Sequence, residues 1–118
     1  MTTRVGQGDY QYEVVSDWAK LPEGWTWGWI PAVGVDSQDR VIVSSRSEHT
    51  LIIFDTDGNV IESWDDTVLV PENAHGVYID AQDNIYLTEW LGHCVHKFNS
   101  GGELQWTLGT PGVPRPAG

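Results

Sequence analysis

The sequence predicts an all-β fold: two four-stranded blades of a β-propeller portion plus one orphan outer strand. The main observation is an ungapped repeat, in which Val33–Trp64 aligns with Val77–Leu108 and Asp36 meets Asp80, 44 residues later. The second observation is that no window shows the 3.6-residue apolar period of a helix. Four short antiparallel strands in a repeat of about 40–45 residues are typical of a propeller blade.

Each copy contains four short β-type runs joined by turn residues. In the first copy the runs are AVGVD, RVIVSS, TLIIFD and NVIESW. The turns between them include Ser37-Gln38-Asp39 and Thr56-Asp57-Gly58, and Asp-Gly is a strong hairpin signal. The pattern predicts blades over residues 32–65 and 75–109.

A partial third copy lies upstream, where Tyr12–Trp18 aligns with Gly58–Trp64. It predicts the orphan outer strand within residues 10–19, of the kind that completes the last blade of a closed propeller. Residues 110–118, which end in PGVPRPAG, are expected to form a linker-like tail.

Two blades cannot close a ring, and closure is what removes the exposed edges of a propeller. Either the chain is the N-terminal part of a longer propeller, or several copies assemble. The second interpretation predicts self-association, with a homotrimer closing a six-bladed ring. Three copies would bring surplus strands, so the orphan strand would have to be left over or swapped.

Composition narrows the classes of partner. The chain has 118 residues, with 6 Lys and Arg against 17 Asp and Glu, and a net charge of −11. This balance argues against nucleic acid and against anionic membrane surfaces. There is no apolar run near the roughly 18 residues that span a bilayer, and no apolar leader at the start, so a cytoplasmic location is expected. Cys94 is the single cysteine, which permits no internal disulfide.

The segment WTWGWIP concentrates three of the seven tryptophans. In an extended strand Trp25, Trp27 and Trp29 would share one face. One interpretation is that they wedge sheets together. The other is a non-enzymatic, lectin-like binding module, in which the three rings stack against a ligand such as a sugar.

Two segments resemble the NHL type of six-bladed propeller and, within it, the peptidyl-α-hydroxyglycine α-amidating lyase family. VGVDSQDRVIVSSRSEH resembles that family's first-blade segment, in which an arginine and a following Asp/Glu-His end the second strand. ENAHGVYIDAQDNIYLTEWLGHCVHKF resembles the next blade, with Pro-His-Gly, an aliphatic strand, Thr-Asp and a histidine before the third strand. The resemblance covers nearly all of residues 10–110 but only part of a family domain.

The resemblance implies a lyase that releases glyoxylate from a peptidyl α-hydroxyglycine, using zinc held by three histidines from different blades. His75 matches the first zinc histidine, and the preceding copy has Pro31 at that place. Arg46 matches the catalytic arginine, which is thought to stabilise negative charge on the substrate; the second copy has Trp90 there. The alternative for Arg46 is a salt bridge to Glu48 or to a neighbouring blade.

The backbone carbonyls of Val33 and Val77 fall where the family holds a structural calcium ion. Two residues depart from the family pattern: Ala74 replaces a usual proline, and Ser47 replaces a usual glycine. The other zinc histidines and the catalytic tyrosine belong to blades that this sequence lacks. Because catalytic zinc needs about three protein ligands, a single chain should be inactive unless copies of His75 converge in an oligomer.

The remaining candidates are interpreted as structural. His49 and His93 share a repeat position, which indicates a framework role. His93 and His96 are three apart on a strand, which puts them on opposite faces and argues against a shared metal. Cys94 has no activating partner that the sequence identifies. Four aspartates are expected to cap their own turns rather than bind calcium: Asp36, Asp39, Asp80 and Asp83.

Overall fold

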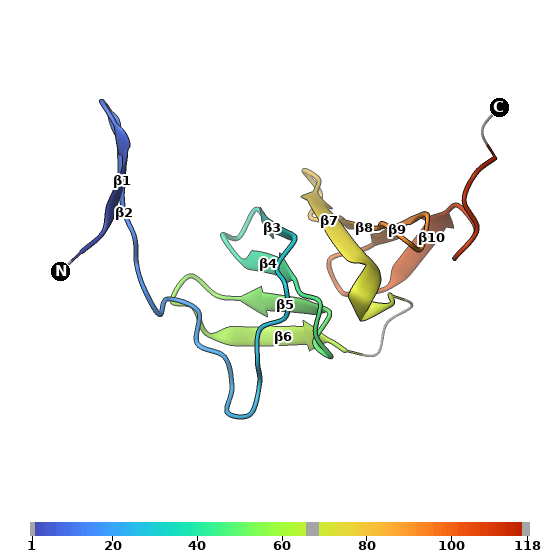
Figure 1. The fold of residues 1–118 in the computed structure, drawn as a ribbon, viewed down its shortest axis with the longest axis horizontal. Coiled ribbons are helices and arrows are strands. Elements are labelled where there is room, and N and C mark those ends of the chain that lie inside the picture. Colours follow the sequence, from blue (N-terminus) through green and yellow to red (C-terminus); the bar gives the residue numbers. More distant parts are fainter. Residues whose placement is uncertain (1, 66–68, 117–118) are drawn as a thin grey trace.

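The computed structural model, which describes residues 2–65 and 69–116, contains the two predicted blades as four-stranded antiparallel sheets (Figure 1). The first blade has strand order β3-β4-β5-β6 and the second β10-β9-β8-β7. The strands of the first blade are β3 (Ala32–Val35), β4 (Val41–Ser44), β5 (Leu51–Phe54) and β6 (Val60–Trp64). Those of the second are β7 (Ala74–Ile79), β8 (Ile85–Glu89), β9 (Cys94–Phe98) and β10 (Leu104–Leu108).

A short 3-10 turn, η1 (Pro71–Asn73), leads into β7. Among the described residues, nothing helical has the length and apolar character that a membrane crossing requires. Over residues 110–116 the tail forms an isolated bridge between Thr110 and Val113, and the backbone N–H of Gly112 donates to the carbonyl of Gly92 at 2.9 Å; residues 117–118 lie outside the described part.

The tight turns of both blades share one side-chain geometry. Asp36 Oδ1 accepts the backbone N–H groups of Gln38 and Arg40, both at 2.9 Å. An equivalent side-chain oxygen accepts two backbone N–H groups, two and four residues onward, at Asp55, Asp80 and Asn99. These bonds satisfy backbone groups that the hairpin leaves unpaired, so the predicted turn role of Asp36 and Asp80 is confirmed.

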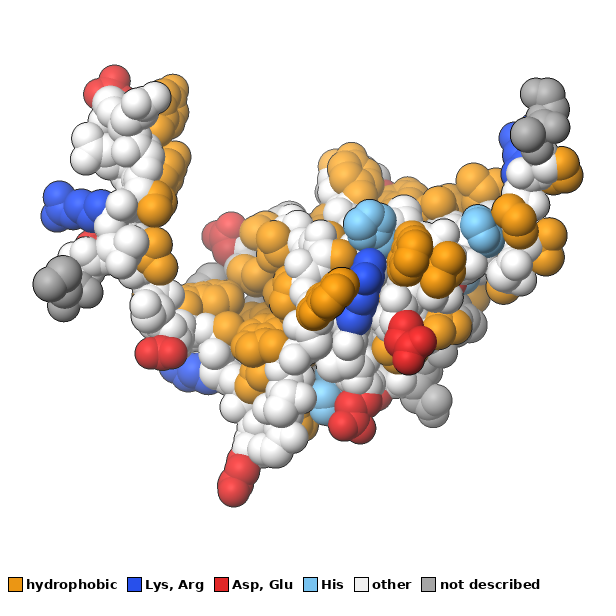
Figure 2. Space-filling view, in the orientation of Figure 1, with side chains coloured by type: hydrophobic (Ala, Val, Ile, Leu, Met, Phe, Trp, Pro, Cys, Tyr) orange, Lys and Arg blue, Asp and Glu red, His pale blue; other side chains and the backbone are white. Residues whose placement is uncertain are grey.

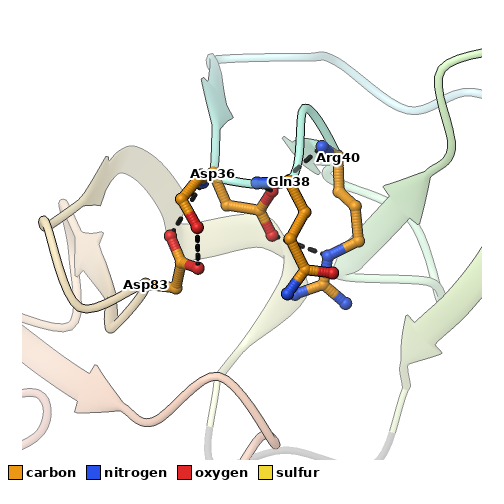
Figure 3. A network of polar contacts seen from close by, with 5 residues as sticks. Asp36, Gln38, Arg40 and Asp83 are labelled. Carbon is orange, nitrogen blue, oxygen red and sulfur yellow. Dashed lines mark hydrogen bonds and ion pairs between the residues drawn. The ribbon is translucent and has the colours of Figure 1, made fainter.

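The inner turns of the two blades are joined by hydrogen bonds. Ser37 donates its backbone N–H and its hydroxyl to the two carboxylate oxygens of Asp83, at 2.8 and 2.6 Å. Within the turn that contains Ser37, Arg40 Nε lies 2.6 Å from Asp36 Oδ2 (Figure 3). The carboxylate of Asp83 was expected to cap its own turn, but it bonds the turn of the other blade and so anchors blade 2 to blade 1.

These carboxylates predict a loss of stability in acid. Hydrogen bonds from Ser37 hold the pKa of Asp83 below its ordinary value of 3.8, and the side-chain hydrogen bond from Asn84 does the same for Asp80. Because the folded pKa values are depressed, the stabilisation is complete above pH 3.8 and is lost as the pH falls through the folded values. Urea unfolding at decreasing pH should show this loss, with a shallower pH dependence for Asp83→Asn. An unchanged pH dependence in that variant would contradict the role of Asp83.

An apolar core joins the facing sides of the two blades. Its buried members are Ile42, Leu51, Ile53, Trp64, Leu69, Ile85, Leu87 and Phe98, with Val77 and Ile79 packed against them. Gly34 on β3 permits the close approach of β7, because a Cβ at this position would lie 2.9 Å from Cγ1 of Ile79. The innermost strands β3 and β7 therefore lie in contact.

The upstream segment differs from the prediction. Strand β2 (Tyr10–Glu13) pairs antiparallel with β1 (Arg4–Gln7), which the sequence analysis did not predict, so the described residues contain ten strands rather than nine. Figure 1 shows this hairpin apart from the two blades. The orphan strand expected over 10–19 is limited to Tyr10–Glu13, where its pairing with β1 ends at Arg4, and the chain then turns at Asp17, which has a φ of 59°. Beyond that turn, one face of blade 1 is covered by Trp18, Ala19, Leu21 and Trp25.

Candidate functional site

Arg46 follows β4 and is held at two points. Its backbone N–H donates to the carbonyl of Trp29 at 2.9 Å, and its Nε donates to the carbonyl of Ala74 at 3.0 Å. Ala74 begins β7, so the second bond joins the end of a strand in blade 1 to the entry of the inner strand in blade 2. Among the described residues Arg46 has no carboxylate partner, and the expected alternative of a salt bridge to Glu48 is not formed.

Two indole rings flank the guanidinium group. Cζ of Arg46 lies 5.8 Å from the ring centroid of Trp29 and 5.7 Å from that of Trp90. Arg46 and Trp90 occupy equivalent repeat positions, yet the packing of the blades brings them into contact. Trp90 is itself anchored by a hydrogen bond from Nε1 to the carbonyl of Glu72 at 3.3 Å. Cation–π contacts of this kind contribute about 0.5–2 kcal/mol and fix the guanidinium plane.

A pocket of about 500 Å³ opens beside this arginine, and it is lined by Trp27, Gly28, Trp29, Arg46 and Glu72. Figure 2 shows hydrophobic side chains gathered around a basic side chain near the middle of this face, with a histidine close by. The terminal guanidinium nitrogens have no hydrogen-bond partner within the described part of the chain. They are available to an anionic ligand, and a carboxylate matches the planar fork of donors.

His75 is the residue after Ala74 on β7, and its side chain is exposed. The hydrogen bond from Arg46 to Ala74 therefore places both predicted site residues at the same end of the inner strand. In the described ranges, His75 belongs to no group of three side chains that could hold a metal ion. Since a catalytic zinc site needs about three protein ligands, the residues of one chain do not form such a site at His75.

The three tryptophans of WTWGWIP do not share a face, so this prediction was wrong. The segment contains no strand, because Gly28 and Pro31 within it, and Pro22 and Gly24 just before it, interrupt extended pairing. Trp25 stacks on His49, with ring centroids 3.5 Å apart, and belongs to the cover of blade 1. The ring centroid of Trp27 lies 5.9 Å from that of Phe54, and Trp27 also lines the pocket. Trp29 is 78% exposed and lies beside Arg46.

Comparison with known proteins supports the repeat type. No family model matches the chain. It is 31% identical over 111 residues to human NHL repeat-containing protein 3, an alignment covering 86% of this chain and 31% of the relative. It is 32% identical over 105 residues to the mouse protein of the same name, covering 80% of this chain and 29% of the relative. The two sheets are NHL-type propeller blades.

The chain spans less than a third of the length of these NHL relatives, since it covers 31% and 29% of them. Their names identify the repeat and state no activity. The similarity therefore supports the propeller architecture, while a lyase activity and its metal ions remain matters for proposal.

Val33 and Val77, whose carbonyls are expected to bind calcium, lie on the inner strands of the two NHL blades. Val33 is on β3 and Val77 on β7, which contact each other. The calcium site itself stays a prediction.

The two histidines expected to be framework residues differ in their surroundings. His49 is packed under Trp25, with Nδ1 2.9 Å from Asp65 Oδ1. His93 is exposed and takes a left-handed conformation with φ of 57°, just before β9. His96 is buried on β9, whereas His93 precedes the strand, so the two histidines do not lie on opposite faces of one strand as predicted.

A buried polar cluster in the second NHL blade was missed by the sequence analysis. Glu89, Cys94 and His96 lie on one face of β8 and β9, and their ligand atoms are all within 4.8 Å of one another. Burial, and then the charge of Glu89, raise the pKa of the Cys94 thiol, which disfavours a nucleophilic thiolate. The spacing Cys94-x-His96 is the feature of the sequence that could have predicted this cluster, because alternate residues of a strand share a face.

Proposed function

We propose that this chain supplies two blades of a lyase-like NHL propeller, in which Arg46 binds the carboxylate of a peptidyl α-hydroxyglycine. The observation that supports this proposal is the hydrogen bond from Arg46 Nε to the carbonyl of Ala74, directly before His75. It holds the anion-binding group and the first candidate zinc ligand at one end of the inner strand. Trp29 and Trp90 limit the motion of the guanidinium group between them.

The proposed reaction is a lyase step without net oxidation. The hydroxyl group of the substrate loses its proton, the bond from the α-carbon to the peptide nitrogen breaks, and that nitrogen takes up a proton. The products are glyoxylate and an amidated peptide. The carboxylate is present in the substrate and in glyoxylate, so an arginine that binds it orients the reacting carbon throughout bond cleavage.

His75 would be one of three zinc ligands, and the carbonyls of Val33 and Val77 would hold calcium. The remaining zinc ligands must come from further blades, either in a longer chain or in other copies. A homotrimer is one such arrangement, with three copies of His75 at the axis. A single chain alone should therefore lack lyase activity.

The second candidate is a non-enzymatic binding module. It is favoured by the exposed ring of Trp29, which is 78% exposed, and by Trp27 in the wall of the same pocket. A sugar stacked on these rings would need no metal and no carboxylate.

The test is the mass of the chain in solution by light scattering, with zinc content measured on the same peak and glyoxylate release assayed on the fraction. The lyase proposal predicts a trimer in which about one zinc per three chains is lost on His75→Ala but retained in the matched control His93→Ala. A monomer whose zinc content is the same in His75→Ala, and which releases no glyoxylate even when mixed with zinc, would contradict the trimer. Sugar binding that survives chelation and is lost on Trp27→Ala would favour the binding module.

A further inference from the structure

The buried cluster of Glu89, Cys94 and His96 follows directly from the strand register. Glu89 on β8 pairs directly with Cys94 on β9, and Leu87 pairs with His96. Because side chains two residues apart point to the same face, His96 lies diagonally beside Glu89 on the face that also carries Cys94. The three residues are 6%, 4% and 1% exposed, respectively.

The hydrogen bonds around His96 fit two tautomers of its ring. Nε2 of His96 lies 2.7 Å from Glu89 Oε2, and Nδ1 lies 2.8 Å from the hydroxyl of Thr107. In one tautomer Nε2–H donates to Glu89, and Nδ1 accepts from the hydroxyl of Thr107. In the other, Nδ1–H donates to Thr107, and the lone pair of Nε2 is directed toward Glu89, where it can bind a metal ion that the carboxylate shares. Metal-bound histidines commonly use their second nitrogen in this way, as a donor to a neighbouring oxygen.

Glu89 is also oriented by a second contact, since Oε1 accepts the backbone N–H of Val70 at 2.9 Å. The carboxylate thus has one oxygen committed to the backbone and one directed at His96. Ligating carboxylates in metal sites are oriented by hydrogen bonds of this type.

The cluster is absent from the other blade. At the equivalent positions, 44 residues earlier, the chain has Ser45, Thr50 and Ile52, and the residue equivalent to Thr107 is Ser63. All three members of the cluster therefore break the repeat together, while a hydroxyl side chain is present at the fourth position in both copies. The blade framework can form without them, since β4 and β5 pair in the same register.

The cluster is reached from an adjacent pocket. This pocket, of about 490 Å³, is lined by residues that include Glu89, Cys94, His93 and Arg115. Two glycines permit its close packing: a Cβ on Gly92 would lie 2.7 Å from Cβ of Glu89, and one on Gly109 would lie 2.5 Å from the carbonyl oxygen of His93. A ligand or water can thus approach the cluster from one side, while the core covers the other.

We propose that Glu89, Cys94 and His96 bind a divalent cation of the zinc class, with its remaining coordination position open to this pocket. Sulfur, imidazole nitrogen and carboxylate oxygen are the donors that zinc takes in proteins. Zinc bonds of about 2.0–2.3 Å separate tetrahedral ligand atoms by roughly 3.3–3.7 Å. The present ligand atoms, within 4.8 Å of one another, reach that range by small side-chain rotations. The site lies within one blade, so it does not depend on the oligomer proposed for His75.

Cobalt(II) titration of the whole chain tests this site, because a thiolate ligand gives cobalt an intense charge-transfer absorption in the near ultraviolet. We expect one cobalt per chain with this band, displaced by zinc. Cys94→Ser should abolish the band, and His75→Ala should leave it unchanged. Thr107→Val should weaken cobalt binding about tenfold or more, since it removes the oxygen that orients His96.

Circular dichroism of Cys94→Ser verifies that the variant is folded, and Thr107→Val in an intact Cys94 background tests the site independently. Cobalt uptake without the thiolate band, or a band that persists in Cys94→Ser, would overturn the proposal. An absence of uptake by the folded wild-type chain would also overturn it and identify the cluster as a buried Glu89–His96 ion pair.

Discussion

Replacing Phe54 with alanine should lower the free energy of unfolding by about 3–5 kcal/mol. Phe54 ends β5 and is fully buried. Its ring centroid lies 5.7 Å from that of Trp18 and 5.9 Å from that of Trp27. The substitution would open a cavity between blade 1 and the segment that covers it. Because small domains are stable by only about 5–15 kcal/mol, a large share of the total would be lost.

Urea unfolding followed by tryptophan fluorescence measures this effect. The matched control is Ile61→Ala on β6, where the side chain is 49% exposed and the change should stay within about 0.5 kcal/mol. Equal effects of the two substitutions would contradict the packing of Trp18 and Trp27 on blade 1. The experiment therefore tests the part of the fold in which the structure departs from the sequence prediction.

Replacing Arg46 with alanine should weaken glyoxylate binding by about tenfold to a hundredfold, if this side chain binds the carboxylate. Hydrogen bonds to charged groups contribute about 1.5–3 kcal/mol, and each 1.4 kcal/mol corresponds to a factor of ten. Arg46→Lys should recover only part of the affinity. Lysine keeps the charge but lacks the planar fork that bonds both the carbonyl of Ala74 and a carboxylate.

The measurement is a glyoxylate titration followed by the indole N–H signals of Trp29 and Trp90 in NMR spectra. Arg4→Ala, in the exposed β1 strand, changes the net charge equally and should leave the affinity unchanged. Glycolaldehyde, which lacks the carboxylate, should not produce the same shifts. Unaltered glyoxylate binding by Arg46→Ala would contradict the proposed role of the arginine, whatever the oligomeric state.

The blades were predictable because their determinants are local and occur twice. Alternating apolar runs, turn aspartates and the ungapped repeat predict eight strands, and all eight are present. The two positions that break the repeat at the inner end, Arg46 and His75, are joined through Ala74. A residue that departs from a repeated framework is free of the constraint that the framework imposes, which is why these positions were useful candidates.

The errors arose where the chain lacks a second copy for comparison. Residues 10–31 align only in part with the repeat, so periodicity alone could not tell a strand from an irregular segment. Trp25, Trp27 and Trp29 are spaced for one face of a strand, yet prolines and glycines interrupt the pairing that a strand needs. Trp25 became part of the cover of blade 1 because burial of its ring against His49 removes apolar surface from water.

By itself, the sequence determined the all-β class, the two four-stranded blades, their turns and the residues that interrupt the repeat. Only the tertiary structure decided that Arg46 lies between Trp29 and Trp90, and that Glu89 joins Cys94 and His96. The physical reason is the range of the interactions. Strand and turn propensities act over a few residues, whereas contacts between strands and between blades depend on register and on close approach at Gly34, which no local pattern specifies.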